Sequence, residues 1–214
     1  MVKILPSVLS LDYSDTKSGL DLIKQYCEII HFDVMDGHFV SNLSFGPDIL
    51  KAFKKYTNLI MDVHIMVDNP ELISKIMIEA GADIITFHYE VFDCDDDLIV
   101  LADKIRANNV KVGLSIKPKT RVAEIKHLLD YFDLILVMSV EPGLGGQGFI
   151  MESLEKIQEL KQLKINNHHH YIIEVDGGIN DQTVNAVKKA GAEWLVSGSY
   201  LFKGDFKTKL DSLL

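Results

Sequence analysis

Short runs of apolar and β-branched residues alternate along the chain with longer amphipathic stretches. Eight such runs are candidate strands, over residues 3–7, 29–33, 59–64, 83–88, 111–116, 134–138, 171–176 and 194–197. Helical patterns lie near residues 14–27, 47–56, 70–80, 95–108, 121–129, 151–164 and 181–190, with a last one after Lys203. This alternation is typical of βαβ units that build a parallel sheet.

The number of units narrows the choice of fold. Eight strand–helix units in 214 residues leave about 27 residues for each, close to the minimum for a strand, a helix and two short loops. Eight parallel strands with eight helices close into a (β/α)8 barrel, the TIM barrel. An open, doubly wound sheet is the alternative, but it usually has fewer strands, and no GxGxxG motif follows the first strand. We therefore expect an α/β protein with a single TIM barrel domain over residues 1–214.

Composition and charge narrow the class of protein. Hydrophobic residues make up 47% of the chain and charged residues 25%, which is usual for a packed domain. A net charge of −9 argues against nucleic acid or an anionic membrane as the main partner. No run approaches the roughly 20 apolar residues of a membrane span, and the first residues lack a signal-peptide layout. Cys27 and Cys94 form no disulfide framework, so we predict a cytoplasmic protein.

Ionisable side chains recur where candidate strands end, and this is the end of a TIM barrel that carries the active site. His31 and Asp33 lie two residues apart and so share one face of a strand. His64 ends the third strand, and Asp176 ends the seventh. Two imidazoles and two carboxylates can converge above the barrel, and such ligands suit Zn²⁺, Fe²⁺ or Mn²⁺. The alternative is four separate polar groups bonded to the backbone.

Glycines and methionines gather near the same end of the predicted barrel. Seven of the 14 glycines follow the last three strands: Gly143, Gly145, Gly146, Gly148, Gly177, Gly178 and Gly198. Loops in this corner commonly bind phosphate through their backbone N–H groups, although tight turns alone would also use glycine. Three methionines at or just past strand ends either fill the core or cover the reacting atoms: Met35, Met66 and Met138.

These features together predict chemistry on a phosphorylated substrate. A metal ion can stabilise an enediolate as a Lewis acid. One carboxylate of the pair Asp33 and Asp176 would remove a proton next to a carbonyl, and the other would return it from the opposite face. The net reaction is an epimerisation.

Several segments carry a resemblance to a known family. They are LPSVLS at 5–10, HFDVMDGHFVSNLSFGP at 31–47, DVHIMV at 62–67, FHYE at 87–90, VMSVEPGLGGQGFI at 137–150, VDGGI at 175–179 and VSGS at 196–199. With these segments the chain resembles the ribulose-phosphate 3-epimerase family, one of the ribulose-phosphate-binding barrels, over essentially its whole length. The run from His31 and the VEPGLGGQ segment are the most specific.

The resemblance implies an isomerase that interconverts D-ribulose 5-phosphate and D-xylulose 5-phosphate in the pentose phosphate pathway. It implies one divalent metal ion bound by His31, Asp33, His64 and Asp176, with the two aspartates as the acid/base pair. The implied substrate contacts are Ser7, His64, Met35, Met66, Met138, Gly143, Leu144, Gly145, Gly146, Gly177, Gly178, Gly198 and Ser199. It further implies a homo-oligomer, either a dimer or a hexamer, whose partner is a small phosphorylated ketose.

The sequence departs from the family pattern at two loop positions, and two other functions stay open. Ser41 stands where the family usually has proline and Ser44 where threonine is common, which bears on the rigidity of this loop. A hexulose-6-phosphate 3-epimerase, such as the allulose 6-phosphate enzyme, would share the motifs and the mechanism. A non-catalytic phosphosugar-binding barrel would not need two carboxylates beside a metal. A lyase is disfavoured, because Met35 and His38 replace the Lys and Asp of the DxKxxD motif in related decarboxylases.

Three charged residues are expected inside the barrel besides the candidate site. By strand parity Lys3, Asp62 and Glu174 point inward. Buried charges must pair, so we expect an internal ion pair between Lys3 and one or both carboxylates. His88 ends the fourth strand and could line the pocket. The three histidines at 168–170 precede the seventh strand and are expected at the opposite end, exposed to solvent.

Overall fold

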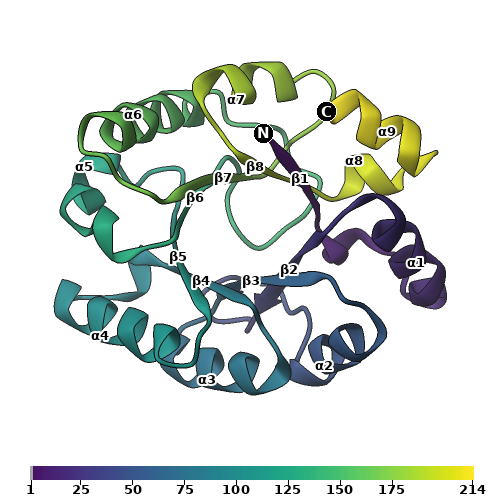
Figure 1. Ribbon diagram of the computed structural model, residues 1–214, viewed down its shortest axis with the longest axis horizontal. Coiled ribbons are helices and arrows are strands. Elements are labelled where there is room, and N and C mark those ends of the chain that lie inside the picture. Colours follow the sequence, from purple (N-terminus) through teal and green to yellow (C-terminus); the bar gives the residue numbers. More distant parts are fainter. Residues whose placement is uncertain (1) are drawn as a thin grey trace.

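The computed structural model, which describes residues 2–214, is a TIM barrel and confirms the predicted α/β fold. Its eight parallel strands form one sheet in the order β1-β8-β7-β6-β5-β4-β3-β2. A parallel bridge between Ser7 and His31 joins the two edge strands. The helices surround this ring of strands on the outside (Figure 1).

The elements follow the predicted ranges closely. The strands are β1 (Lys3–Pro6), β2 (Ile29–Met35), β3 (Ile60–Met66), β4 (Ile84–His88), β5 (Lys111–Ile116), β6 (Leu134–Met138), β7 (Ile172–Asp176) and β8 (Trp194–Ser197). The α-helices are α1 (Thr16–Tyr26), α2 (Pro47–Tyr56), α3 (Pro70–Ala80), α4 (Asp95–Arg106), α5 (Val122–Ile125), α6 (Ser153–Asn166), α7 (Val184–Ala190), α8 (Ser199–Phe202) and α9 (Phe206–Leu213). Short 3₁₀ turns supplement them: η1 (Val8–Ser10), η2 (Tyr13–Asp15), η3 (Tyr89–Val91) and η4 (Lys126–Tyr131).

Local signals explain where individual helices begin and end. At α3 the Asn69 side chain accepts a hydrogen bond from the N–H of Leu72, and Pro70 fills the first turn, where a missing N–H costs nothing. The helix ends at Gly81, whose φ of 104° lies in the left-handed region that favours glycine. Gly81 therefore turns the chain back toward β4 directly after the end of α3, the helix that packs one face against the barrel.

The apolar side chains of the strands belong mainly to two separate clusters, because successive side chains point to opposite faces. The larger cluster lies between the sheet and the helices, and β2 supplies Phe32, whose ring centroid lies 5.4 Å from that of Phe45 and 5.9 Å from that of Phe53. The smaller cluster fills the barrel interior and includes Leu5, Ile29, Ile84, Leu134, Leu136, Met138, Trp194 and Val196. The alternation leaves the inward positions of β2 free for polar chemistry while its outward positions anchor the strand.

The predicted internal ion pair of Lys3 is wrong. The Nζ atom of Lys3 lies 2.8 Å from Glu28 Oε2, and 44% of the Lys3 side chain is exposed. Lys3 is the first residue of β1, so its long side chain reaches water at the rim. Inside the barrel, the Nδ1 atom of His31 lies 2.7 Å from Asp62 Oδ2 and 3.2 Å from Glu174 Oε1.

The histidines between α6 and β7 lie apart from the strand ends that carry the candidate site. The predicted exposure is confirmed for His168 and His170 but wrong for His169, which lies beside Asp130 with 9% of its side chain exposed. Over residues 2–214 none of the helices combines the length and the apolar character that crossing a membrane requires.

The outward face of β2 makes a testable prediction about stability. We expect Phe32→Ala to lower the free energy of unfolding by about 3–5 kcal/mol, because it leaves a cavity among the rings of Phe45 and Phe53. The matched control is Ile165→Ala on α6, where the side chain is 57% exposed and the expected change stays within about 0.5 kcal/mol. Urea unfolding measures both values. Equal losses for the two variants would contradict the proposed division of β2 into a packing face and an inner face.

Candidate functional site

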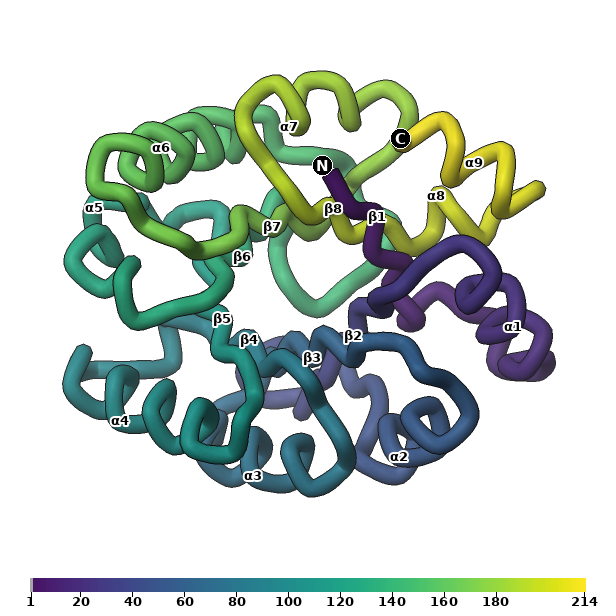
Figure 2. The backbone as a smooth tube through the Cα atoms, viewed as in Figure 1, coloured from purple at the N-terminus to yellow at the C-terminus, as the bar shows by residue number. Residues whose placement is uncertain are grey.

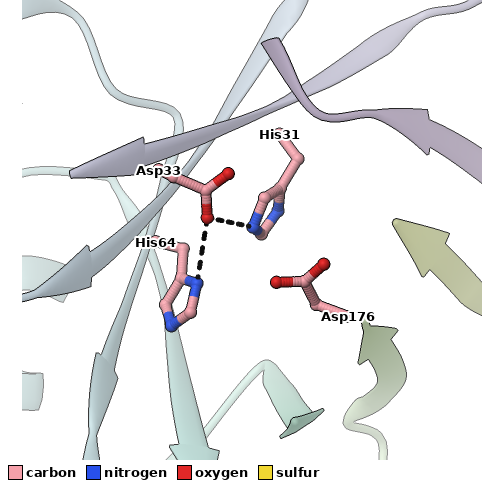
Figure 3. Close-up of side chains that lie close together, drawn as sticks. All are labelled: His31, Asp33, His64 and Asp176. Carbon is pink, nitrogen blue, oxygen red and sulfur yellow. Dashed lines mark ion pairs between the residues drawn. The ribbon is translucent and has the colours of Figure 1, made fainter. Parts of the chain in front are cut away.

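Four ionisable side chains converge at the C-terminal end of the barrel (Figure 3). His31 and Asp33 come from β2, His64 from β3 and Asp176 from β7. Each offers one donor atom, and these atoms all lie within 4.8 Å of one another. The Oδ1 atom of Asp33 lies 3.3 Å from His31 Nε2 and 3.4 Å from His64 Nδ1. The structure thus brings together the residues that strand position suggested.

The arrangement of these groups suits a divalent cation. The Nε2 atom of His31 and the Nδ1 atom of His64 are buried and have no hydrogen-bond partner within residues 2–214. Buried polar atoms without partners are costly, so a group that binds both nitrogen atoms would stabilise this arrangement. Two imidazole nitrogens facing two carboxylates match the donor set of Zn²⁺, Fe²⁺ or Mn²⁺. The four residues could therefore hold one such ion.

The two aspartates have environments that separate their pKa values. Burial opposes ionisation of Asp33, but the neighbouring imidazoles of His31 and His64 outweigh it and hold the pKa of Asp33 well below its usual range. Burial and the nearby charge of Asp33 raise the pKa of Asp176 to about 6. A pair of carboxylates with separated pKa values can divide the roles of acid and base between them.

Serine hydroxyls on two other segments fix the position of Asp33. Ser7, just after β1, donates a hydrogen bond of 2.8 Å to Asp33 Oδ2. Ser44, in the loop after β2, donates to the carbonyl oxygen of Asp33 over 2.6 Å and accepts from the N–H of Met35 over 2.9 Å. Both of these hydrogen bonds use the hydroxyl group, which serine shares with the threonine common at this position.

Two further carboxylates lie beneath the site, on the inner face of the barrel. Asp62 and Glu174 are both fully buried beside His31 Nδ1. Burial and the charge of Asp62 raise the pKa of Glu174 well above its usual range. Burial lowers the pKa of His31, but the charges of Asp33 and Asp62 outweigh it and leave that pKa well above the usual value. His31 is thus held between carboxylates on both of its nitrogens.

A cavity of about 280 Å³ opens above Asp33 and Asp176. It is lined by twelve of the predicted substrate contacts, Ser7, Met35, Met66, Met138, Gly143, Leu144, Gly145, Gly146, Gly177, Gly178, Gly198 and Ser199. The remaining one, His64, is completely buried below. The connection between β6 and α6 reaches across the centre of the ring in the view of Figure 2, and its Gly143 carbonyl accepts a hydrogen bond from Asn42.

One corner of the cavity, called the glycine corner below, is formed by the glycines after β6, β7 and β8, and it requires glycine at particular positions. Gly178 has a φ of +64°, and a Cβ atom there would lie 2.6 Å from the backbone nitrogen of Phe149. Ser199 lines this corner as the first residue of α8, so its N–H has no partner within the helix. Lys203 also lines this corner, and the sequence reasoning did not find it.

The expectation that His88 lines the pocket is wrong, because His88 lies behind His64 and beside Glu90, a residue that the sequence did not single out. His88 does not line the cavity; its Nε2 atom lies 2.9 Å from His64 Nε2, and its Nδ1 atom lies 3.1 Å from Glu90 Oε2. Burial lowers the pKa of His88 to about 4. Burial opposes ionisation of Glu90, but hydrogen bonds from His88, Thr120 and the Lys117 backbone outweigh it and lower its pKa to about 2. The spacing in FHYE, with Glu two residues after His, was the available signal.

Comparisons with known proteins agree with this geometry. A profile of the ribulose-phosphate 3 epimerase family matches residues 3–202. The chain is 40% identical over 208 residues to ribulose-phosphate 3-epimerase of Treponema pallidum, covering 97% of this chain and 94% of that protein. It is 41% identical over 204 residues to the Bacillus subtilis protein of the same name, covering 94% and 93%. The solved 3-keto-L-gulonate-6-phosphate decarboxylase from Vibrio cholerae matches over 99% of this chain and 95% of its own, with a TM-score of 0.74 and 15% identity, a likeness of fold alone.

The hydroxyl of Ser44 gives a prediction about the loop after β2. We expect Ser44→Ala to lower the free energy of unfolding by about 1–3 kcal/mol, because the Asp33 carbonyl and the Met35 N–H lose their partner. Ser44→Thr keeps the hydroxyl and should stay within about 0.5 kcal/mol of the wild type. Thermal and urea unfolding of the two variants side by side give the comparison. A threonine variant as unstable as the alanine variant would show that the side-chain hydroxyl is not what holds this loop.

Proposed function

Because the chain belongs to the ribulose-phosphate 3-epimerase family and is an isomerase, we propose that it interconverts D-ribulose 5-phosphate and D-xylulose 5-phosphate. One observation supports this above all others. Asp33 and Asp176 line the same cavity from different strands, and their pKa values are shifted in opposite directions. Epimerisation at a carbon beside a carbonyl needs two such groups, one for each face of the carbon.

In the proposed reaction the substrate lies in the cavity with C3 between the two aspartates. Asp33, ionised and held by Ser7, accepts the proton of C3 in one direction of the reaction. Asp176, whose pKa is raised, delivers a proton to the opposite face of the enediolate, and the roles exchange in the reverse direction. Met35, Met66 and Met138 cover this part of the cavity with apolar surface and exclude water from the reacting carbon.

We further propose that His31, Asp33, His64 and Asp176 hold one divalent cation, Zn²⁺, Fe²⁺ or Mn²⁺. When bound, the ion supplies Lewis acidity that favours the negative charge of an enediolate. The imidazoles orient the two aspartates toward each other, and the glycine corner with Ser199 offers backbone N–H groups to the phosphate of the substrate. A phosphorylated ketose therefore fits the cavity with its charged end at β7 and β8 and its reacting carbon over β2.

The wider setting of the reaction follows from the same proposal. Interconversion of these two pentulose phosphates belongs to the pentose phosphate pathway, and a cytoplasmic location is proposed with it. A homo-oligomer, as a dimer or a hexamer, stays a prediction that measurement of the mass in solution would decide.

Loss of either carboxylate is expected to abolish proton transfer. Asp33→Asn and Asp176→Asn should each lower turnover of D-ribulose 5-phosphate by about 10²–10⁴-fold, because general acid–base groups contribute that much. The assay follows deuterium at C3 of the product in D₂O with Mn²⁺ or Zn²⁺ present. Asp130→Asn, an exposed aspartate at the other end of the barrel, is the matched control and should keep wild-type turnover.

The same assay separates the alternatives. A carboxylate variant that retained more than about a tenth of wild-type turnover would refute the two-carboxylate mechanism. Turnover of allulose 6-phosphate but not of D-ribulose 5-phosphate would reassign the substrate to a hexulose phosphate. Binding of both sugars without deuterium exchange in any metal would make the protein a phosphosugar-binding barrel.

Removal of the cation makes a prediction independent of turnover. Protein treated with a chelator should regain one equivalent of Mn²⁺ or Zn²⁺ on titration, and a cation at 100 times its Kd should add about 2.7 kcal/mol to the free energy of unfolding. Calorimetric titration and thermal unfolding measure the two quantities. His169→Ala removes a histidine distant from the site and should leave the stoichiometry unchanged. Unchanged binding after His64→Ala would place the cation elsewhere.

A further inference from the structure

A chain of hydrogen bonds leads from His64 away from the cavity. His64 Nε2 lies 2.9 Å from His88 Nε2, and His88 Nδ1 lies 3.1 Å from Glu90 Oε2. Both histidines are buried, with exposures of 0% and 1%, so water does not compete for the bond between them. The chain ends on the opposite oxygen of Glu90, where Oε1 accepts from the Lys117 N–H over 2.6 Å and from the Thr120 hydroxyl.

For a neutral His88, the carboxylate of Glu90 fixes the direction of both hydrogen bonds along the chain. A carboxylate only accepts hydrogen bonds, so the proton between His88 and Glu90 resides on His88 Nδ1. A neutral His88 then presents a lone pair at Nε2, and the proton between the two rings belongs to His64 Nε2. It follows that His64 Nδ1 carries a lone pair, and this is the atom that faces Asp33 and lacks a hydrogen-bond partner within the described chain.

We propose that Glu90 and His88 are positioning residues that fix the tautomer of His64 and so prepare its Nδ1 atom to bind the catalytic cation. The inference rests on the proposed cation site and deepens it. Neither residue reaches the cavity, so both act through His64. Groups beyond the ligands of a metal often set its affinity in this way. The usual arrangement is one carboxylate on a ligating histidine, as Asp62 provides for His31, whereas a second histidine is inserted here.

The surroundings of the chain hold its members in place. The ring of Phe39 lies 4.7 Å from that of His88, and the Lys117 Nζ lies 3.7 Å from the Phe39 centroid. The loop that supplies Lys117 is in turn fixed from α6, because Lys156 Nζ donates to the carbonyl oxygens of Lys117 and Pro118. The donors on Glu90 Oε1 are therefore rigid, and they determine which way a side chain at this position can turn.

Because the two oxygens of Glu90 have different partners, an isosteric substitution can reverse the direction of the hydrogen bonds between Glu90 and His64. In Glu90→Gln the amide oxygen is expected at the Oε1 position, where two donors require an acceptor, which places the NH₂ group against His88 Nδ1. His88 would then donate from Nε2, and His64 would carry its proton on Nδ1, toward the cation site. We expect Glu90→Gln to weaken binding of Mn²⁺ or Zn²⁺ by about 10–100-fold without a change in side-chain volume.

The matched control keeps the carboxylate and removes one of its other partners. Thr120→Val deletes a hydrogen bond to Glu90 but leaves the direction of the other hydrogen bonds intact. Its Kd for Mn²⁺ should therefore differ from the wild-type Kd by much less than the tenfold expected when a group behind a metal ligand is lost. Calorimetric titration of chelator-treated wild type, Glu90→Gln and Thr120→Val with Mn²⁺ gives the three Kd values. Equal Kd values for wild type and Glu90→Gln would overturn the proposal, as would equal weakening by both variants. Absence of binding by the wild type would instead overturn the cation site itself.

A spectroscopic measurement on the wild type needs no variant to fold. Nitrogen-15 NMR of the metal-free protein with labelled histidine should show His64 as the tautomer protonated at Nε2 and His88 as the tautomer protonated at Nδ1. In Glu90→Gln both assignments should exchange. A wild-type His64 protonated at Nδ1 would contradict the proposal, even if cation binding and epimerisation were both found.

Discussion

Asp33 is buried between two imidazoles, and its carboxylate is where the fold and the site depend on each other. Its Oδ1 atom faces His31 and His64, and its Oδ2 atom accepts from Ser7. A carboxylate in this position without such partners would cost several kcal/mol of stability. Because Ser7 belongs to the β1 side and Asp33 to β2, the same hydrogen bond spans the seam where the barrel closes. The site therefore helps to close the sheet that positions it.

The two-residue period of the strands separates packing from chemistry. In β2 the side chains of His31, Asp33 and Met35 face the interior and the cavity, while Phe32 and Val34 pack outward in the large cluster. Substitutions on the outward face thus change stability with little effect on the reacting groups. The inner face has no such freedom, since each ionisable group there serves as partner to another.

Much of the fold followed from the sequence, because apolar runs and helix signals are local. The ranges of β5, β6 and β8 match those expected, and so do α2 and α3, with Pro at the start of each helix. The helix expected over 121–129 is instead a short α5 followed by a 3₁₀ turn, a difference that periodicity does not reveal. Strand ends likewise indicated the four residues that converge, since parallel strands bring their carboxyl ends to one edge.

The predictions that failed concern residues whose partners lie across the barrel or on another loop. Strand parity placed Lys3 inside, but its position at the first residue of β1 lets the ammonium group reach Glu28 at the rim. The partners of Asp62 and Glu174 could not be chosen from sequence, because their distance to His31 depends on how the ring closes. Glu90 was missed for a related reason: its relation to His64 passes through His88 and a turn, η3, whose shape no local pattern fixes.

The order of the strands has a consequence for how the protein is made. Each residue of β1 pairs with β8, from Lys3 with Trp194 to Pro6 with Ser197, whereas β1 meets β2 through one bridge. β1 therefore cannot form its complete set of strand pairs until β8 has been synthesised, and pairing between segments so distant in sequence is slow. Asp176 also emerges long after the two histidines it faces. The reacting groups are consequently brought together only after β7 has been synthesised, and nascent chains that lack β7 lack the paired carboxylates.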